Sequence, residues 1–233
     1  IFNMYRSTSF SQVPEVVKNL LIINGLFFLA KISLESQGVY IERLFALHPF
    51  QSPDFMPHQL ITHFFMHANL LHLLSNMFAL WMFGKILENV WGGKRFLTYY
   101  MITGLGAAFL HLGVIQYQIF ELSNNLPELI ELAKNGRYNP AISNSLKLTQ
   151  LISTPTVGAS GAVFGILLAF GMLFPNTRLY LFSSFLILIS FEIIFSISLP
   201  IFYIFIILLI ISKISPNLNH YIWHTTPIKA KYF

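Results

Sequence analysis

Gly158-Ala159-Ser160-Gly161-Ala162-Val163-Phe164-Gly165 places one serine among small residues at the start of an apolar stretch. Glycines on both sides of a serine let another backbone come close to its hydroxyl. A serine nucleophile also needs a base and hydrogen-bond donors for the oxyanion. Helix packing is an alternative, because Gly161, Gly165 and Ala169 recur every four residues, as in small-residue contacts between membrane helices. That repeat does not explain Gly158 and Ser160, so the stretch alone leaves catalysis and packing open.

The composition around this stretch is that of a membrane protein. Of 233 residues, 55% are hydrophobic and only 10% are charged, whereas about a quarter of the residues in soluble domains are charged. Several apolar runs approach the roughly 20 residues that cross a bilayer as a helix. We therefore predict an all-α, polytopic membrane protein with spans at about 14–35, 66–87, 96–119, 156–174 and 182–211. The polar residues 120–155 are expected to form an aqueous loop or small subdomain.

Residue counts exclude several kinds of site. The chain has no cysteine, and Asp54 is its only aspartate. Thiolate metal sites, cysteine nucleophiles and a pair of catalytic aspartates are therefore excluded. No His-Glu pair occurs, which excludes the H-E-x-x-H zinc proteases. Among membrane-embedded proteases only the serine type remains, and we expect neither metal nor cofactor. The net charge of +5 is scattered and is read as a topology signal, so no nucleic-acid partner is expected.

A second polar cluster, His67-Ala-Asn-Leu-Leu-His72-Leu-Leu-Ser-Asn76, lies at the start of the second span. The i, i+4 spacing of His72 and Asn76 puts them on one helix face, where both can donate hydrogen bonds to a carbonyl oxygen. A polar pair within a membrane helix is a functional hypothesis by default. The alternative is hydrogen bonding between helices.

Other polar residues have plainer interpretations. His63 and His67 are also four apart and could share an ion, but no carboxylate or cysteine joins them. We expect His67 instead to tie the outer loop to the helix by hydrogen bonds. His111 is interpreted as a core histidine with a satisfied partner. Lys18 and Lys31 dilute the first span and are expected to snorkel to its opposite ends.

The positive residues predict an orientation. Lys85, Lys94 and Arg95 follow the second span and Arg178 follows the fourth, so these connections and the N-terminus are expected to be cytoplasmic. The second and fourth spans then both run inward, and His72 and Ser160 lie at similar depth toward the outer side. Two motifs about 90 residues apart can therefore meet. A bacterial inner membrane is the expected location.

Together these residues resemble the rhomboid intramembrane serine proteases over roughly residues 10–181. The resemblance rests on Gly158-Ala-Ser160-Gly161 with Gly165, and on the H-x4-H-x3-N set His67, His72 and Asn76. It implies a six-helix membrane core that cuts transmembrane helices near a locally unwound end, using a Ser–His dyad. It implies that Ser160 is the nucleophile and that His72, Asn76 and the Ser160 amide are oxyanion donors. Residues 36–62 resemble the family's membrane-dipping loop without its usual Trp-Arg pair.

The resemblance fails near the C-terminus. The family's base histidine lies on a sixth span in an Ala-His-x-Gly-Gly setting, but no glycine follows Gly171. The Gly161/Gly165 stripe would normally pack against that missing helix. We therefore divide the chain into a rhomboid-like core, 1–181, and an atypical segment, 182–233, read as an insertion or misread sequence. About five spans instead of six are expected, and only His220 or His224 remains as a candidate base.

Two rival functions stay open. Without a base, the chain could be an inactive rhomboid-like binder of transmembrane segments. A transporter or channel is disfavoured because the sequence has no internal repeat. The lipid bilayer is an expected partner in every case, and the oligomeric state is not predicted.

Overall fold

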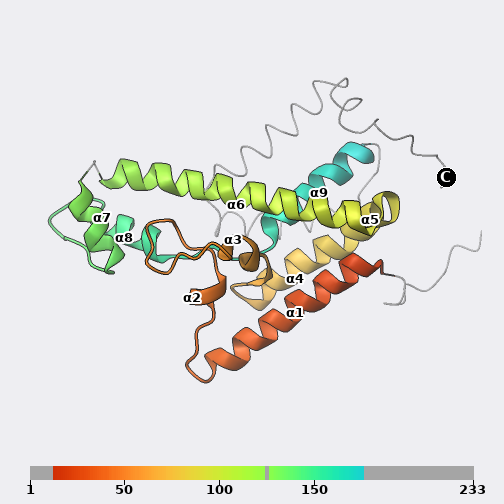
Figure 1. Ribbon diagram of the computed structural model, residues 1–233, viewed down its shortest axis with the longest axis horizontal. Coiled ribbons are helices and arrows are strands. Elements are labelled where there is room, and N and C mark those ends of the chain that lie inside the picture. Colours follow the sequence, from red (N-terminus) through yellow and green to blue (C-terminus); the bar gives the residue numbers. More distant parts are fainter. Residues whose placement is uncertain (1–12, 124–125, 176–233) are drawn as a thin grey trace, which may run out of the picture. The chain divides into compact units, whose positions relative to one another are not determined.

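The computed structural model describes residues 13–123 and 126–175 (Figure 1). The chain divides into two compact units, Ile1–Leu167 and Leu168–Phe233, and nearly everything described lies in the first. Within the described ranges the regular structure is helical and includes no strand, which confirms the all-α membrane fold. The expected last span, the atypical segment 182–233, His220 and His224 lie outside the described residues.

Three helical stretches are long and apolar enough to cross a membrane: Glu15–Glu35, Leu70–Trp91 and Gly93–Ser123. The first is α1 and the third is α6; the second comprises α4 (Leu70–Ala79), a π-helical turn η3 (Leu80–Gly84) and α5 (Lys85–Trp91). A shorter apolar helix, α9, covers Ser160–Leu173. These bounds confirm the spans predicted at about 14–35, 66–87 and 96–119; α9 lies within the predicted span 156–174 but is shorter than a crossing helix.

Helix α1 packs against η2, α4, η3 and α6 through one face. Its buried residues are spaced three or four apart, as one face of a helix requires; they are Val17, Leu20, Asn24, Phe28 and Lys31. Lys31 therefore points into the protein, and the expectation that it snorkels to the end of the span is wrong. The opposite face is apolar and exposed, with Leu26 and Leu29 59% and 65% accessible. That face is suited to lipid.

A buried carboxylate joins the start of α1 to the end of α5. Glu88 accepts hydrogen bonds from the backbone N–H groups of Val16 and Val17, at 2.9 and 2.8 Å. Negative charge at a helix N-terminus pairs with unsatisfied N–H groups and with the helix dipole. Because the other end of α1 contacts the start of α4 through Lys31, α1 runs antiparallel to the α4–η3–α5 stretch.

The connection from α1 to α4 is compact and contains α2 (Glu42–Phe45), α3 (Gln59–Thr62) and η2 (His63–Phe65). Gln59 organises it from a fully buried position. Its Oε1 accepts from the backbone N–H groups of His48 and Met56, and its Nε2 donates to the carbonyl of Asp54 at 2.8 Å. One side-chain amide thus satisfies several backbone groups that would otherwise be unpaired.

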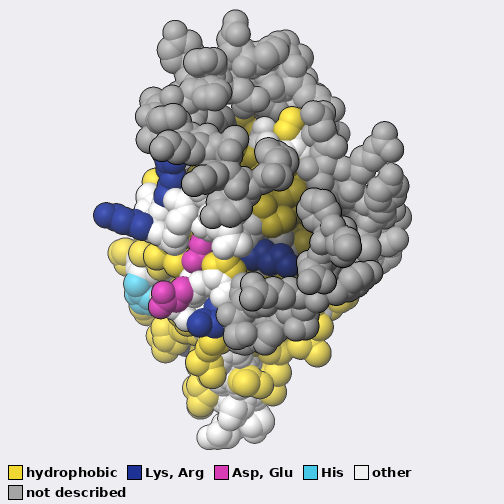
Figure 2. Space-filling model, turned by 90° about the vertical axis from the view of Figure 1, so that its right-hand side faces the viewer, with side chains coloured by type: hydrophobic (Ala, Val, Ile, Leu, Met, Phe, Trp, Pro, Cys, Tyr) yellow, Lys and Arg dark blue, Asp and Glu magenta, His cyan; other side chains and the backbone are white. Residues whose placement is uncertain are grey.

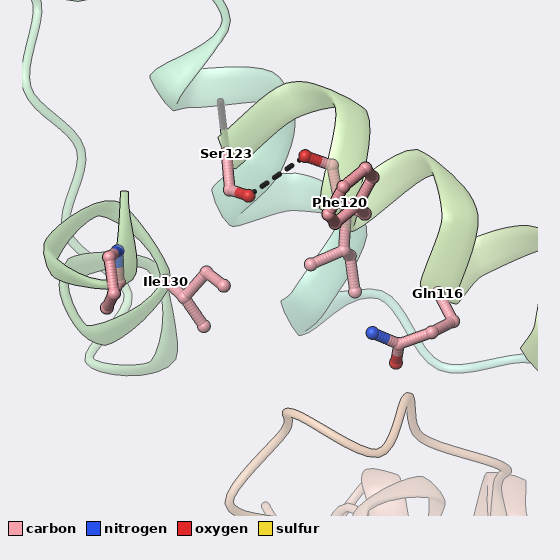
Figure 3. Close-up of a pocket in the computed structure, with 6 residues that line it drawn as sticks. Gln116, Phe120, Ser123 and Ile130 are labelled. Atoms are coloured by element: carbon pink, nitrogen blue, oxygen red, sulfur yellow. Dashed lines mark hydrogen bonds between the residues drawn. The ribbon is translucent and has the colours of Figure 1, made fainter. Parts of the chain in front are cut away.

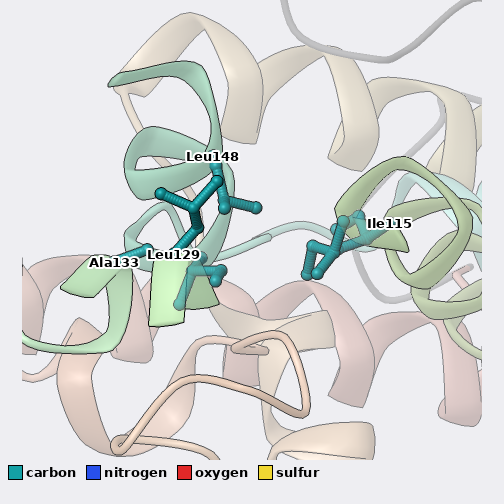
Figure 4. Packing of buried hydrophobic residues seen from close by; sticks show 6 residues of the cluster. Ile115, Leu129, Ala133 and Leu148 are labelled. Atoms are coloured by element: carbon teal, nitrogen blue, oxygen red, sulfur yellow. The ribbon is translucent and has the colours of Figure 1, made fainter. Parts of the chain in front are cut away.

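Residues 120–155 form a small helical subdomain. Helices α7 (Pro127–Lys134) and α8 (Ser145–Ser153) pack on each other and on the end of α6. We call their shared apolar core the hairpin cluster (Figure 4); it consists of Ile115, Ile119, Leu129, Ala133, Leu148 and Ile152. At 31 residues, α6 is about 46 Å long, which exceeds the roughly 30 Å of hydrocarbon. Its last turns are therefore available to support the hairpin.

The surface matches a chain in lipid. On the face shown in Figure 2, hydrophobic side chains cover the lower part of the molecule, and charged side chains gather nearer its middle. Exposed large hydrophobic residues also occur on α6, including Ile102 and Phe109 at 63% and 55% accessibility. Exposed apolar side chains along spanning helices contact acyl chains when the helices cross a bilayer.

Candidate functional site

Ser160 opens α9 directly after a backbone turn that needs glycine. Gly158 has a φ of +119°, a conformation that L side chains rarely adopt. Its N–H donates to the carbonyl of His63 at 2.9 Å, which anchors the turn to η2. Ala159 is fully buried, whereas Ser160 is partly exposed. The hydroxyl is thus presented at a helix start by a turn with fixed geometry.

The His72 ring lies directly against this turn. A Cβ atom built on Gly158 would lie 2.8 Å from both Nε2 and Cε1 of His72. His72 belongs to the first turn of α4, where Asn69 is the N-cap and its Oδ1 accepts from the His72 N–H at 2.8 Å. The structure therefore brings the two sequence motifs together, at the starts of α4 and α9. We call His72, Gly158 and Ser160 the motif junction.

Asn76 follows His72 by one helical turn and is 6% exposed. Its Nδ2 donates to the carbonyl of His72 at 2.8 Å, and the hydroxyl of Ser75 donates to the same carbonyl. A side-chain amide carries two N–H bonds. One hydrogen of Asn76 is thus bonded within its own helix, and the second remains for another acceptor.

His67 packs beside the motif junction. Its ring centroid lies 5.1 Å from that of His72, with the planes at 69°, and the side chain is 1% exposed. Neither ring nitrogen has a hydrogen-bond partner among the described residues. Within that part of the chain, the hydrogen bond of His67 to a helix is made by its backbone carbonyl, which accepts from Lys31 of α1, and not by its ring. Burial lowers the pKa of His67 to about 3.

His63 contributes to the same region from η2. Its Nδ1 is hydrogen bonded to the carbonyl of Gln59 at 2.7 Å, and burial lowers its pKa to about 4. Both His63 and His67 are thus neutral at neutral pH. Within the part of the chain that the structure describes, no group of three or more His, Cys, Asp or Glu side chains is arranged to hold a metal ion.

The segment before Gly158 is held by two further contacts. Thr156 forms an isolated antiparallel bridge with Leu47, with N–H···O distances of 2.8 and 2.9 Å. The Thr156 hydroxyl also lies 2.6 Å from Nε2 of His111. His111 does have a partner, as the sequence predicted. Its link to the Ser160 segment was missed, because a lone histidine on an apolar helix carries no signal about what it faces.

The small-residue stripe of α9 packs against α6. A Cβ on Gly161 would lie 2.5 Å from Cβ of Ala107, and one on Gly165 would lie 2.5 Å from Cβ of Thr103. Among the described residues the partner of these two glycines is therefore α6, whereas the sequence led us to expect a helix beyond residue 181. The hydroxyl of Tyr99 donates to the carbonyl of Gly165 at 3.0 Å. Close helix approach of this kind requires small side chains on both sides.

A separate pocket of about 250 Å³ lies at the other end of α6, where α7 begins (Figure 3). Its lining is mostly apolar, and the Ser123 hydroxyl beside it is bonded to the carbonyl of Phe120. The lining residues are Gln116, Ile119, Phe120, Ser123, Pro127 and Ile130. None of them belongs to the motif junction.

Comparison with known proteins shows the family of the chain. A family model described as Rhomboid domain matches residues 54–220, which is more than half of the chain. The chain belongs to the rhomboid family. Members of this family are generally intramembrane serine proteases. The match begins after residue 10 and continues past residue 181, so its limits differ from those of the resemblance seen in the motifs.

Curated rhomboid proteins are similar over part of their length. Rhomboid protein 1, mitochondrial, of Saccharomyces cerevisiae is 31% identical over 118 residues, which are 51% of this chain and 25% of the yeast protein. Rhomboid-like protein 11, chloroplastic, of Arabidopsis thaliana is 31% identical over 153 residues, 61% of this chain and 40% of that protein. The mouse presenilin-associated rhomboid-like protein, mitochondrial, is 26% identical over 171 residues, 73% and 36% respectively.

The matched stretches therefore span well under half of these relatives. Their names place them in mitochondria or chloroplasts, so the bacterial inner membrane expected from the sequence has no support. No solved structure matches significantly. What is established is an integral membrane protein of the rhomboid family.

Proposed function

We propose that this chain carries the active site of an intramembrane serine endopeptidase that cleaves transmembrane helices. The observation that carries the proposal is the contact between the His72 ring and Gly158, two residues before Ser160. A donor side chain from the start of α4 thereby lies against the backbone turn that leads to the hydroxyl at the start of α9.

The proposed chemistry follows from these groups. The Ser160 oxygen attacks a substrate peptide carbonyl, and the carbonyl oxygen becomes an oxyanion. His72, the second N–H of Asn76 and the backbone N–H of Ser160 are the proposed donors to that oxyanion. Ser160 is the first residue of α9, where backbone N–H groups have no partner within the helix. Removing one such donor typically costs about 10²–10³ in rate.

The general base must come from elsewhere. His67 is an unsuitable base because its ring is buried with a pKa near 3, whereas a base works best with a pKa near the working pH. His220 and His224 stay as candidates from the sequence. A non-catalytic binder of transmembrane segments is the second candidate function, favoured by the absence of a base from the described residues around Ser160.

We propose that the site faces the side of the membrane opposite to Lys85, Lys94 and Arg95. His72 lies at the start of the Leu70–Trp91 stretch, and these cations lie at or beyond its end. The positive-inside rule then assigns the N-terminus to the cytoplasmic side, or to the equivalent side of an organelle membrane. The absence of native cysteine allows a test: single cysteines at positions 94 and 139 should react with an impermeant maleimide from opposite sides.

Labelling of the purified chain with a fluorophosphonate probe tests the proposed chemistry. Wild-type protein should be labelled covalently at Ser160, and Ser160→Ala should reduce labelling to background. Ser153→Ala is a matched control, because Ser153 is exposed on α8 and bonds only within its own helix. Cleavage of a transmembrane peptide by wild-type protein but not by Ser160→Ala would support the protease. Absence of labelling together with peptide binding would support the binder instead.

A further inference from the structure

Lys31 is a buried cation on the inward face of α1, and it lies beside the chain segment that leads to His72. The residue is 7% exposed. A spanning helix needs no charge at such a position, and a charge removed from water is expensive unless it is paired and hydrogen bonded. The contacts of the Lys31 ammonium group therefore indicate its structural role.

Three acceptors surround the Lys31 ammonium group. Nζ donates to the carbonyls of His67 and Ala68, both at 3.0 Å, and lies 2.8 Å from Oε1 of Glu42. An ammonium group has three N–H bonds, so these contacts can use all of them. Glu35, one turn later on α1, lies at 3.7 Å. Lys31 thus joins α1, α2 and the segment 67–68.

The two carbonyls immediately precede the cap of α4. Asn69 follows Ala68, and its side chain accepts from the His72 N–H at 2.8 Å. The orientation of residues 67–68 therefore sets where α4 begins. The His72 ring projects from that first turn and lies against Gly158 with no room for a methyl group between them. A shift at the start of α4 would move the ring relative to Ser160.

We propose that Lys31 is a positioning residue, which holds the carbonyls of residues 67 and 68 so that the His72 ring stays against the Gly158 turn. Its link to catalysis rests on the proposed function of Ser160. Glu42 supports the role by keeping the ammonium in place. Burial alone would raise the pKa of Glu42, but the hydrogen bond from Lys31 and backbone hydrogen bonding outweigh it, and the pKa lies below its usual value.

Hydrogen exchange of Lys31→Met tests the positioning without any need for activity. Methionine is unbranched and only one heavy atom shorter than lysine, and it removes all three donors. Amides of residues 66–73 should exchange at least about 10-fold faster than in wild type, whereas those of α5 should be unchanged. Lys18→Met is the matched control on the same helix, because the Lys18 side chain makes no hydrogen bond or ion pair with described residues, and its backbone N–H, which donates to the carbonyl of Pro14, is kept. Equal changes in both regions, or none in residues 66–73, would overturn the proposal.

The labelling rate of Ser160 supplies the link to chemistry. Lys31→Met should slow labelling by about 10-fold or more, since misplacement by about 1 Å costs up to 10²-fold. Rescue separates positioning from general destabilisation. Because the chain has no cysteine, Lys31→Cys can be alkylated under denaturing conditions with 2-bromoethylamine, which rebuilds an ammonium of nearly the same reach. After refolding, alkylated Lys31→Cys should be labelled at Ser160 much faster than unalkylated Lys31→Cys. Its labelling rate should approach that of wild-type protein taken through the same denaturation and refolding.

The two proposals fail in different ways. If wild type shows no Ser160-dependent labelling, the proposed protease function is wrong, and the exchange result at residues 66–73 still decides the role of Lys31. If wild type is labelled but Lys31→Met reacts as fast as Lys18→Met, Lys31 does not position the site. If Lys31→Cys is labelled slowly and alkylation does not raise its labelling rate, the proposal is also overturned.

Discussion

The hairpin cluster includes residues of α6, and the motif junction includes the start of α9, which packs on α6. The two regions are held by different interactions. In the hairpin cluster, α6, α7 and α8 meet through six apolar side chains. Around the motif junction, α9 contacts α6 through glycines, Ala107 and Thr103, and polar anchors hold the chain on either side. An apolar cluster loses stability when a side chain is shortened. The motif junction, by contrast, is disrupted when a side chain is enlarged, because a Cβ on Gly158 would overlap the His72 ring.

The largest expected effect is at Gly158. Gly158→Ala would place a methyl group 2.8 Å from the His72 ring at a φ of +119°. The turn must move, so labelling of Ser160 should fall to background. Gly171→Ala is the matched control, because a Cβ there meets no atom of the described residues within 4 Å. Unchanged labelling in Gly158→Ala would show that the geometry of the junction does not limit reactivity.

The next effect is on stability in the other region. Leu148 is fully buried in the hairpin cluster. Leu148→Ala should lower the free energy of unfolding of the α7–α8 subdomain by about 2–5 kcal/mol, measured by hydrogen exchange of α7 and α8 in detergent. Labelling of Ser160 should stay near the wild-type rate, with the exposed Leu146→Ala as the control. A parallel loss of labelling would mean that the two regions are coupled.

The region beside the motif junction should also respond to pH, through the buried histidines His63 and His67. The pKa values of His63 and His67 are about 4 and 3, below the ordinary 6.5. The unfolded chain therefore binds protons below pH 6.5 that the folded chain does not. The stability from each histidine is complete above pH 6.5 and falls by up to about 1.4 kcal/mol per pH unit toward its folded pKa. Unfolding between pH 7 and 5 should show this slope, and His63→Gln should flatten it.

The smallest expected effect is at the contact between α6 and α9. Tyr99→Phe removes the hydroxyl that donates to the Gly165 carbonyl. The free energy of unfolding should fall by about 0.5–1.5 kcal/mol, as read from thermal unfolding, with little change in labelling. Tyr117→Phe, on an exposed part of α6, is the control. A large loss of labelling would show that the hydrogen bond from Tyr99 to Gly165 is needed for the reactivity of Ser160.

The helices were predictable because a bilayer demands a fixed length of apolar residues. The expected spans 14–35 and 96–119 lie within a few residues of α1 and α6. Residues 120–155 were harder. Their polar composition indicated water contact, and each short helix carries only one pair of buried apolar residues four apart, Leu129 with Ala133 and Leu148 with Ile152, which is a weak helical pattern. The choice between a loop and a subdomain depended on α6 extending beyond the hydrocarbon.

The members of the candidate site could be named from the sequence, but their contacts could not. Spacing alone placed His72 and Asn76 on one face and put Ser160 at a helix start. Spacing did not reveal that the His67 ring lacks a partner among the described residues while its carbonyl has one. Lys31 was read as a snorkelling residue, because a lysine near the end of a span usually reaches for water. The side chain points into the protein instead, because its acceptors come from segments distant in the sequence, namely Glu42 and the carbonyls of residues 67 and 68.

The amino-acid sequence by itself determined that this is a helical membrane protein with rhomboid motifs, since hydrophobic length and residue spacing are local properties of the chain. The tertiary structure decided which partner each polar or small residue has: α6 for the glycine stripe, the carbonyls of residues 67 and 68 for Lys31, and the Gly158 turn for the His72 ring. Those contacts join segments up to about 90 residues apart, and they exist only once the helices have packed.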